Sequence, residues 1–399
     1  MSVRVLRVLV YPSQMEIGGS QWNAIEVAEA LNARGLHKVD LFAPEGELVK
    51  EALDRGLRVA RAGRRGFAPS WKRIRRLRRL VRDNDYDIVH SYEWDTTLDV
   101  YFGSFLPNGV PMVSTILDMQ VPHVVPPDIP LIVGTRELFD EKKSEGRIVS
   151  LMEPPVDLVR NSPFDDPHLA AHREECGAGD KDILLVVVGR VADFKVPGLC
   201  EAVDAIAAIG DPSIKLAIIG GGSGIDEVRA VIDAAHARTG WQFARLLGER
   251  RDPRPYYNAA DACIGMGGSA LKSMAFAKPL IVQGENGFWA LVTDETAPLF
   301  LQQGWYGVGT GDGVVACQAA VQSVANAPAA DHASWGAQGH ALVHERYGLD
   351  NAARIVADAY SLALSRRLPL SRRMTDAWIA TVRVARFHVA RRLSRRRRS

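Results

Sequence analysis

Two cations follow an apolar run in the second half of the chain. The segment "LLVVVGRVADFK" (184–195) places Arg190 and Lys195 just beyond five consecutive Leu and Val residues. Such a run is typical of a strand covered on both faces in a parallel sheet, and ligands of these sheets bind beyond the carboxyl ends of the strands. A bidentate arginine and a lysine point charge suit a diphosphate. The alternative is a pair of solvated surface cations.

Three glycine clusters also follow apolar runs. They lie at 15–21 ("MEIGGSQ"), 220–224 ("GGGSG") and 265–269 ("GMGGS"). None has the spacing of a dinucleotide-binding fingerprint or of a Walker A loop. Glycine lets backbone N–H groups approach a phosphate at the start of a helix, but a tight turn would explain the same residues without a ligand. The candidate ligand-facing residues in these clusters are Gly18, Gly19, Gly222, Gly267, Gly268 and Ser269.

A lysine follows the third cluster. With Ser269 as the N-cap of a helix, Lys272 falls in the first turn, where a capping box would favour Glu. A cation there opposes the helix dipole and costs a few tenths to about 1 kcal/mol. We therefore expect an anion near Lys272; the alternative is a side chain that bends out to solvent.

The histidines and cysteines show no metal-binding pattern. Among the ten histidines, His90 at the end of "DIVH" and His123 in "MQVPHVVPP" are candidates to face a ligand cleft, although core or surface positions are commoner for such residues. The four cysteines form no CxxC pair, which favours reduced thiols in the cytoplasm and disfavours structural zinc. Aromatic residues do not alternate with basic ones, so the sequence disfavours a nucleic-acid partner.

The elements that must position these residues alternate between strand and helix patterns. Short apolar runs and helical periodicity alternate over both halves, and a Pro-, Asp- and Asn-rich segment (153–167) separates them. This pattern predicts an α/β chain of two doubly wound parallel sheets. The expected boundaries are 1–158 and 159–348 for the two domains, 349–365 for a closing helix and 366–399 for a tail.

Composition is that of a soluble globular protein, with 47% hydrophobic and 24% charged residues. No apolar run approaches the roughly 20 residues of a membrane span. The net charge of +2 conceals two basic segments. Residues 61–82 hold ten Lys and Arg and no acid, and residues 366–399 hold twelve arginines and one acid. An anionic surface is therefore an expected partner.

Both basic segments have the pattern of amphipathic helices. The first has an apolar stripe formed by Trp71, Ile74, Leu77 and Leu80/Val81. The second has a stripe formed by Met374, Trp378, Val382, Ala385, Val389 and Leu393. The first helix has a domain to pack against, whereas the tail lies beyond the closing helix. We expect the tail to bind anionic lipid at the inner membrane face, with residues 61–82 as a second contact.

The ordered set of motifs is similar to a known enzyme family. The "GGS" loop at 18–20, "DIVH", "VGR…K", "IIGGG", "LGER…YYNAADACIGM" and "GGSALKSMAFAKPLIV" together resemble the family-four glycosyltransferases of the GT-B fold, over about residues 4–365. The resemblance implies two Rossmann-like domains around a cleft, with the acceptor on the first and a nucleoside-diphosphate sugar mainly on the second.

The resemblance also implies a reaction and roles for single residues. It implies hexosyl transfer with retention and without a metal ion. It implies no cofactor either, since the nucleotide sugar is a substrate. Arg190 and Lys195 would hold the donor diphosphate as the catalytic cations, and Gly18 and Gly19 would approach it from the first domain. The helix at 351–364 would cross back to the first domain.

Four positions depart from the family pattern. Ile264 and Lys272 stand where the family has two glutamates, Leu117 where it has histidine, and Ala277 where it has glycine. These departures leave three alternatives to an active transferase open. They are a non-catalytic subunit that binds a partner glycosyltransferase, a protein that binds anionic surfaces through its arginine segments, and another GT-B enzyme such as a nucleotide-sugar epimerase.

Overall fold

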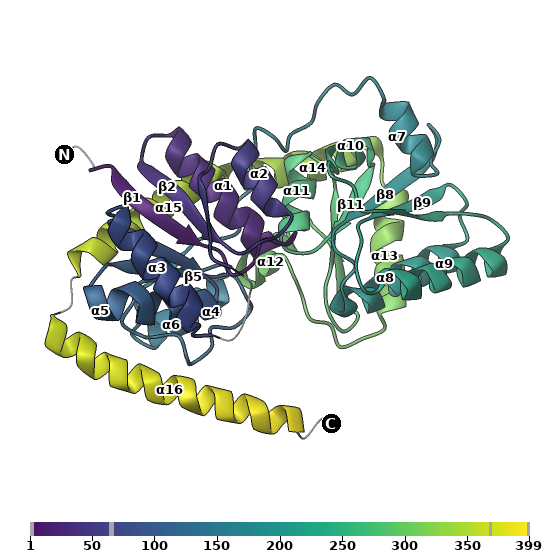
Figure 1. Cartoon of the computed structure of the whole chain (residues 1–399). Coiled ribbons are helices and arrows are strands. Elements are labelled where there is room, and N and C mark those ends of the chain that lie inside the picture. Colours follow the sequence, from purple (N-terminus) through teal and green to yellow (C-terminus); the bar gives the residue numbers. More distant parts are fainter. Residues whose placement is uncertain (1–3, 64–67, 367–368, 397–399) are drawn as a thin grey trace. The chain divides into compact units, whose positions relative to one another are not determined.

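Two sheets form the framework of the chain, one in each of two units (Figure 1). The computed structural model describes residues 4–63, 68–366 and 369–396. Unit 1 comprises Met1–Pro155 and Leu349–Ser399, and unit 2 comprises Val156–Gly348. The division after Pro155 lies close to the boundary expected after residue 158. The predicted fold class, two doubly wound α/β domains, is confirmed.

Unit 1 is built on a seven-stranded parallel sheet in the order β3-β2-β1-β4-β5-β6-β7. Its strands are β1 Leu6–Tyr11, β2 His37–Ala43, β3 Val59–Arg61, β4 Ile88–Tyr92, β5 Met112–Ile116, β6 Leu131–Val133 and β7 Val149–Leu151. Its helices are α1 Gly19–Ala33, α2 Leu48–Asp54, α3 Trp71–Asp83, α4 Trp94–Val100, the π-helix Tyr101–Phe105, α5 Leu106–Asn108, α6 Arg136–Ser144, α15 Leu349–Ser365 and α16 Leu370–Arg396. The strand order reverses between β1 and β4.

Helix α15 closes the core of unit 1 although it is distant in sequence. Val356 and Tyr360 are buried with residues of α1 and β1 in one hydrophobic cluster. The Tyr360 hydroxyl lies 2.8 Å from Nδ1 of His90, and Nε2 of His90 lies 2.7 Å from the hydroxyl of Thr115. Strands β4 and β5 and the returning helix are therefore joined inside the unit.

The basic helix α3 packs on unit 1 through its apolar stripe. Ile74, Leu77 and Val81 are buried, and the buried Arg73 donates to Asp99 at 2.7 Å. Trp71, the first residue of the helix, is 76% exposed. The helix therefore packs on its own domain, as the sequence allowed, through all of its apolar residues except Trp71.

The tail forms α16 and packs against the rest of unit 1, which corrects the expectation that it has nothing to pack against. Ala380 and Val384 are buried, and the Phe387 ring lies 5.1 Å from that of Trp94. The expected stripe lies on another face, because Met374 is 67% and Trp378 72% exposed. The side chains of Val389 and Leu393 and residues 397–399 lie outside the described part of the chain.

Unit 2 holds a six-stranded sheet in the order β10-β9-β8-β11-β12-β13, parallel except for β13. Its strands are β8 Ile183–Val188, β9 Ile214–Ile219, β10 Ala244–Gly248, β11 Ala262–Gly265, β12 Leu280–Gln283 and β13 Trp289–Leu291. Its helices are α7 Leu169–Glu175, the 3₁₀ turn Asp193–Lys195, α8 Val196–Ile209, α9 Ile225–Thr239, α10 Arg254–Ala259, α11 Gly268–Ala275, α12 Ala297–Gln303, α13 Gly313–Ala325 and α14 Ala329–Arg346. Strand β8 lies inside this order, and its residues are apolar because both faces of the sheet are covered there.

Two kinds of feature are absent from the described residues. No helix among them is long and apolar enough to cross a membrane. Within the same residues, no group of three or more His, Cys, Asp and Glu side chains is arranged to hold a metal ion.

Candidate functional site

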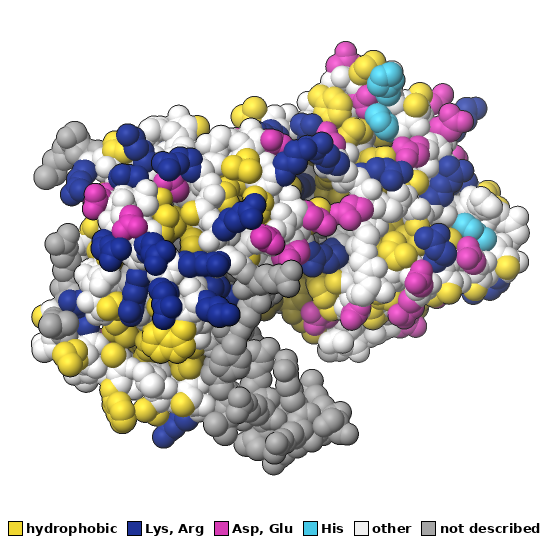
Figure 2. Space-filling view, viewed as in Figure 1, with side chains coloured by type: hydrophobic (Ala, Val, Ile, Leu, Met, Phe, Trp, Pro, Cys, Tyr) yellow, Lys and Arg dark blue, Asp and Glu magenta, His cyan; other side chains and the backbone are white. Residues whose placement is uncertain are grey.

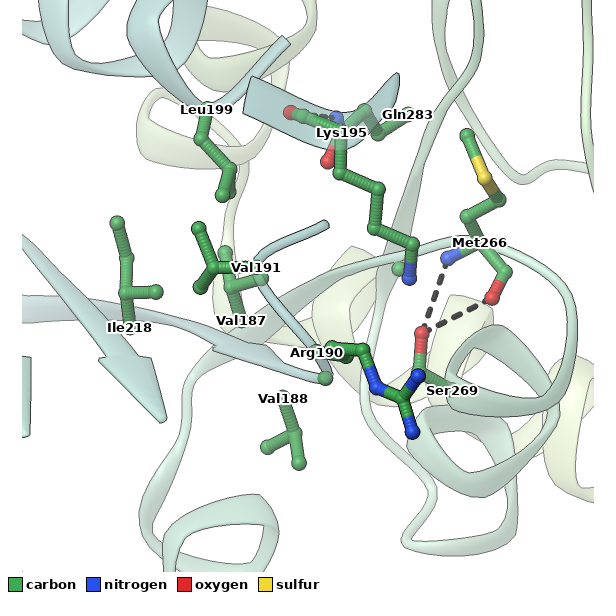
Figure 3. A pocket seen from close by; sticks show the side chains of 12 residues that line it. Val187, Val188, Arg190, Val191, Lys195, Leu199, Ile218, Met266, Ser269 and Gln283 are labelled. Carbon is green, nitrogen blue, oxygen red and sulfur yellow. Dashed lines mark hydrogen bonds between the residues drawn. The ribbon is translucent and has the colours of Figure 1, made fainter. Parts of the chain in front are cut away.

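A pocket opens in unit 2 where the strand order reverses between β8 and β11 (Figure 3). Its wall comes from residues 187–191 at the end of β8 and from Gly265, Met266 and Ser269 at and just after the end of β11, with Lys195 and Gln283. Reversal points of this kind leave a crevice outside the carboxyl ends of the strands, which is where open α/β sheets bind ligands.

Two cations share this pocket. The charged ends of Arg190 and Lys195 both reach the side where Ser269 lies (Figure 3). Among the residues that the structure describes, neither side chain forms an ion pair with an acid. Burial, followed by the positive charge of Arg190, lowers the pKa of Lys195. A bound anion would offset both effects, so the pocket has the electrostatics of an anion site.

Hydrogen bonds fix the frame around these cations. The Gln283 side chain, at the end of β12, donates to the backbone carbonyl of Lys195 at 3.1 Å. The Ser269 hydroxyl donates to the Met266 carbonyl at 3.0 Å and accepts from the Met266 amide at 3.1 Å. Sequence reasoning missed Gln283 and Met266, since neither residue type points to a ligand by itself.

The glycine clusters of unit 2 differ in the space around them. A Cβ added at Gly267 or Gly268 would meet no atom within 4 Å, so the start of α11 is open. A Cβ at Gly222 would collide with the carbonyl of Val191, and one at Gly220 with that of Gly189. Gly222 is therefore explained by the close approach of two backbones, and it does not line the pocket.

The placement of Lys272 corrects the argument that led to it. Helix α11 has Gly267 as its N-cap, not Ser269, so Lys272 is the fifth residue of an eight-residue helix and lies in its last turn. A cation there is favourable toward the helix dipole and needs no anion. Lys272 is half-buried and does not line the pocket.

The carboxyl ends of β1, β4 and β5 hold the other candidates, in unit 1. Gly19 begins α1, and a Cβ there would meet no atom within 4 Å. The next residue, Ser20, donates from its hydroxyl to Oε1 of Glu93 at 2.6 Å. The Leu117 amide, after β5, donates to the same oxygen at 3.3 Å. Sequence reasoning missed Glu93, although a carboxylate one residue beyond a strand was a readable signal.

Neither candidate histidine joins this group. His90 is 1% exposed, and burial lowers its pKa to about 3, so the ring is neutral and both nitrogens are occupied inside unit 1. The prediction that His90 faces a cleft is wrong, because His90 is the middle residue of β4 and Tyr360 of α15 covers it there. His123 is exposed on the loop after β5.

The structure shows the surroundings of two residues that depart from the family pattern, Ile264 and Ala277. Ile264 is 1% exposed within β11 and belongs to the core of unit 2. Ala277 follows α11 with a φ of 54°, a conformation that glycine adopts readily and alanine does not.

Two family models match the chain. The model of Glycosyltransferase Family 4 matches residues 17–121, and that of Glycosyl transferases group 1 matches residues 182–325. Together with the fold, these matches place the chain in the family-four glycosyltransferases of the GT-B fold, a class of transferase enzymes. No curated protein matches the sequence significantly.

Solved structures of glycosyltransferases share the fold at low identity. HepE from Anabaena, in complex with UDP and glucose, is 14% identical with a TM-score of 0.70, over 89% of this chain and 99% of that one. A glycosyltransferase from Rickettsia africae is 15% identical with a TM-score of 0.72, over 90% and 99%. WaaG, a glycosyltransferase involved in lipopolysaccharide biosynthesis, is 13% identical with a TM-score of 0.60, over 88% and 99%.

Proposed function

We propose that this enzyme transfers a hexosyl group from a nucleoside-diphosphate sugar to an acceptor hydroxyl, with retention and without a metal ion or other cofactor. The observation that carries the proposal is the pocket of unit 2, where Arg190 and Lys195 lie together with no acid paired to either in the described structure. HepE has been solved with UDP and with UDP-glucose, which makes uridine the first nucleotide to test.

The proposed chemistry follows from these charges. The bond between the anomeric carbon and the β-phosphate oxygen breaks, and its electron pair leaves with the diphosphate. The acceptor oxygen bonds to the same face of the anomeric carbon, and its proton passes to the leaving diphosphate. Arg190 and Lys195 stabilise the charge that grows on that diphosphate, which is the role a metal ion would otherwise take.

The nucleotide contact proposed for the open glycines is of the backbone kind. Gly267 and Gly268 leave space at the start of α11, where N–H groups favour an anion. Gly18 and Gly19 are the corresponding proposal in unit 1. A contact between Lys272 and the donor stays a prediction, but it no longer rests on the helix dipole.

A panel of UDP-, GDP-, TDP- and ADP-sugars tests the function. We expect at least one of them to raise the melting temperature of the wild type, by RT ln(1 + [L]/Kd) in free energy, and to be hydrolysed slowly without an acceptor. Stabilisation by none of them would contradict the proposal. Stabilisation without turnover would favour the non-catalytic alternative.

We further propose that unit 1 binds an anionic bilayer. The exposed basic residues of α3 are Lys72, Arg75, Arg76, Arg78, Arg79 and Arg82. Figure 2 shows dark blue side chains gathered over this part of unit 1. Trp71, Met374 and Trp378 are large apolar side chains left in solvent. The two helices flank the same segment, because Arg78 donates to the carbonyl of Gly103 and Arg373 to that of Phe105. This combination suits a lipid interface at the inner membrane face.

A further inference from the structure

Glu93 combines a strained backbone with an unpaired buried oxygen. It follows β4 directly and has a φ of 71° with a ψ of 163°, a combination that is essentially confined to glycine and costs about 1–3 kcal/mol. The residue is only 8% exposed. Strain of this kind persists where the surrounding structure fixes it, and such residues concentrate at functional sites.

The two carboxylate oxygens of Glu93 have different surroundings. Oε1 accepts from the Ser20 hydroxyl and from the Leu117 amide, so it joins the loops that follow β1 and β5. Oε2 is buried and has no hydrogen-bond partner among the described residues. A buried polar atom without a partner costs about 1–3 kcal/mol, which a ligand hydroxyl would recover.

The charges that face Glu93 are negative. Burial, followed by the negative charge of Asp118, raises the pKa of Glu93 to about 7, and Asp95 contributes in the same direction. The hydrogen bonds from Ser20 and Leu117 act the other way. Tyr92, the preceding residue, is buried, and its own pKa is raised. The group thus changes charge near neutral pH.

Open space adjoins the loop that donates to this carboxyl. Gly19 precedes the Ser20 that bonds Glu93, and nothing occupies the position its Cβ would take. A hydroxyl donor is the ligand that an ionised oxygen in acidic surroundings favours, whereas a phosphate would be repelled by Asp118 and Asp95. A sugar supplies several hydroxyls and no charge.

We propose that Oε2 of Glu93 accepts a hydrogen bond from a hydroxyl of the sugar acceptor and holds that acceptor at the strand ends of unit 1. This inference rests on the proposed transferase function and adds to it a residue that binds the acceptor. Ionisation of the carboxyl is required, because the neutral acid carries a proton on one of its oxygens and has less capacity to accept.

A purely structural role makes a different prediction, and Glu93→Gln separates the two. The glutamine keeps a carbonyl oxygen that can accept from Ser20 and Leu117, so the link between the loops survives. Its amide group donates where Oε2 accepted, so the acceptor contact is lost. Asp118→Asn is the matched control, since it removes the neighbouring charge and keeps both oxygens of Glu93.

The experiment measures binding of methyl α- and β-glycosides of glucose, galactose, mannose and N-acetylglucosamine to the full chain by saturation-transfer NMR, with UDP titrated separately by calorimetry. We expect at least one glycoside to bind the wild type about tenfold more tightly at pH 8 than at pH 6, as the carboxyl ionises. Glu93→Gln should weaken that binding at least about tenfold at pH 8, remove its pH dependence and leave UDP affinity and melting temperature unchanged. Asp118→Asn should shift the pH profile to lower pH.

Three results would overturn the assignment of Glu93. They are glycoside binding by Glu93→Gln equal to that of the wild type, a flat pH profile in the wild type, and no glycoside bound by a wild type that binds UDP. If no nucleotide or nucleotide sugar binds either, the proposed transferase function fails separately from this inference.

Discussion

The His90 ring and the Tyr360 hydroxyl are joined at 2.8 Å, although 270 positions separate them along the chain. The contact holds α15 against the sheet of unit 1 and keeps His90 buried and neutral. A histidine that would charge in the unfolded chain is thus locked in its uncharged form.

Because His90 is buried in its neutral form, the free energy of unfolding of unit 1 falls as the pH is lowered. The folded pKa of His90, about 3, lies below the unfolded value near 6.5, so only the unfolded chain takes up a proton between these values. The contribution of His90 is fully present above pH 6.5, and it falls by about 1.4 kcal/mol per pH unit as the pH drops below 6.5, until about pH 3. Urea unfolding of the wild type and of His90→Gln from pH 7.5 to 4.5 measures the difference. Equal slopes in both proteins would contradict the burial of a neutral ring.

Arg190→Ala and Lys195→Ala should each lower donor turnover by about 10²–10³-fold, since removing one fixed donor to a developing anion costs about 3–4 kcal/mol. Melting temperature should stay the same, because neither side chain is paired with an acid in the described structure. Arg229→Ala on the exposed face of α9 is the matched control and should leave turnover unchanged. Turnover near the wild-type rate in both pocket variants would remove these residues from the site.

Ala277→Gly should stabilise unit 2 by about 0.5–1 kcal/mol. The gain comes from relief of the positive φ of Ala277, and the greater freedom of glycine in the unfolded chain reduces it. Ala275→Gly, at the buried last residue of α11, is the control, and it should destabilise by about 1 kcal/mol because a buried methyl group is lost. Thermal unfolding of both variants gives the comparison, and a destabilised Ala277→Gly would show that the conformation is not strained.

Trp71→Ala and Trp378→Ala should each weaken binding to anionic vesicles about tenfold, because burying an aromatic side chain in the interface is worth at least about 1.5 kcal/mol. Val159→Ala, at a residue of unit 2 that is 91% exposed, is the control and should bind as the wild type does. Co-sedimentation with phosphatidylserine vesicles, repeated at increasing salt, measures the apolar and the electrostatic contributions to binding. Binding that neither tryptophan nor salt affects would reject this surface.

Sequence patterns located the cations of the pocket because the carboxyl ends of parallel strands share one edge of a sheet. Arg190 needed only the apolar run of β8 to be placed there. Lys272 was misplaced because the start of α11 is set by the backbone of Gly267, with a φ of 56°, and not by a side-chain cap at Ser269. No local pattern could show this.

Long-range packing decided the remaining differences. The sequence made His90 a candidate to face a ligand cleft, but Tyr360 of α15 covers its ring. The tail was expected to have no part of the fold to pack against, but Val384 and Phe387 pack against α4 and its surroundings. Glu93 required three loops to be seen together before its unpaired oxygen became apparent.

The path of the chain has a consequence for synthesis on the ribosome. Unit 1 is interrupted after Pro155 and resumes only at Leu349. The hydrophobic face that α15 covers therefore stays uncovered until all of unit 2 has been synthesised. Unit 2 is continuous and can fold as soon as its own residues have left the exit tunnel. The nascent first sheet meanwhile exposes α1 and the ring of His90 to water, and this half-built intermediate is the form that a chaperone would meet.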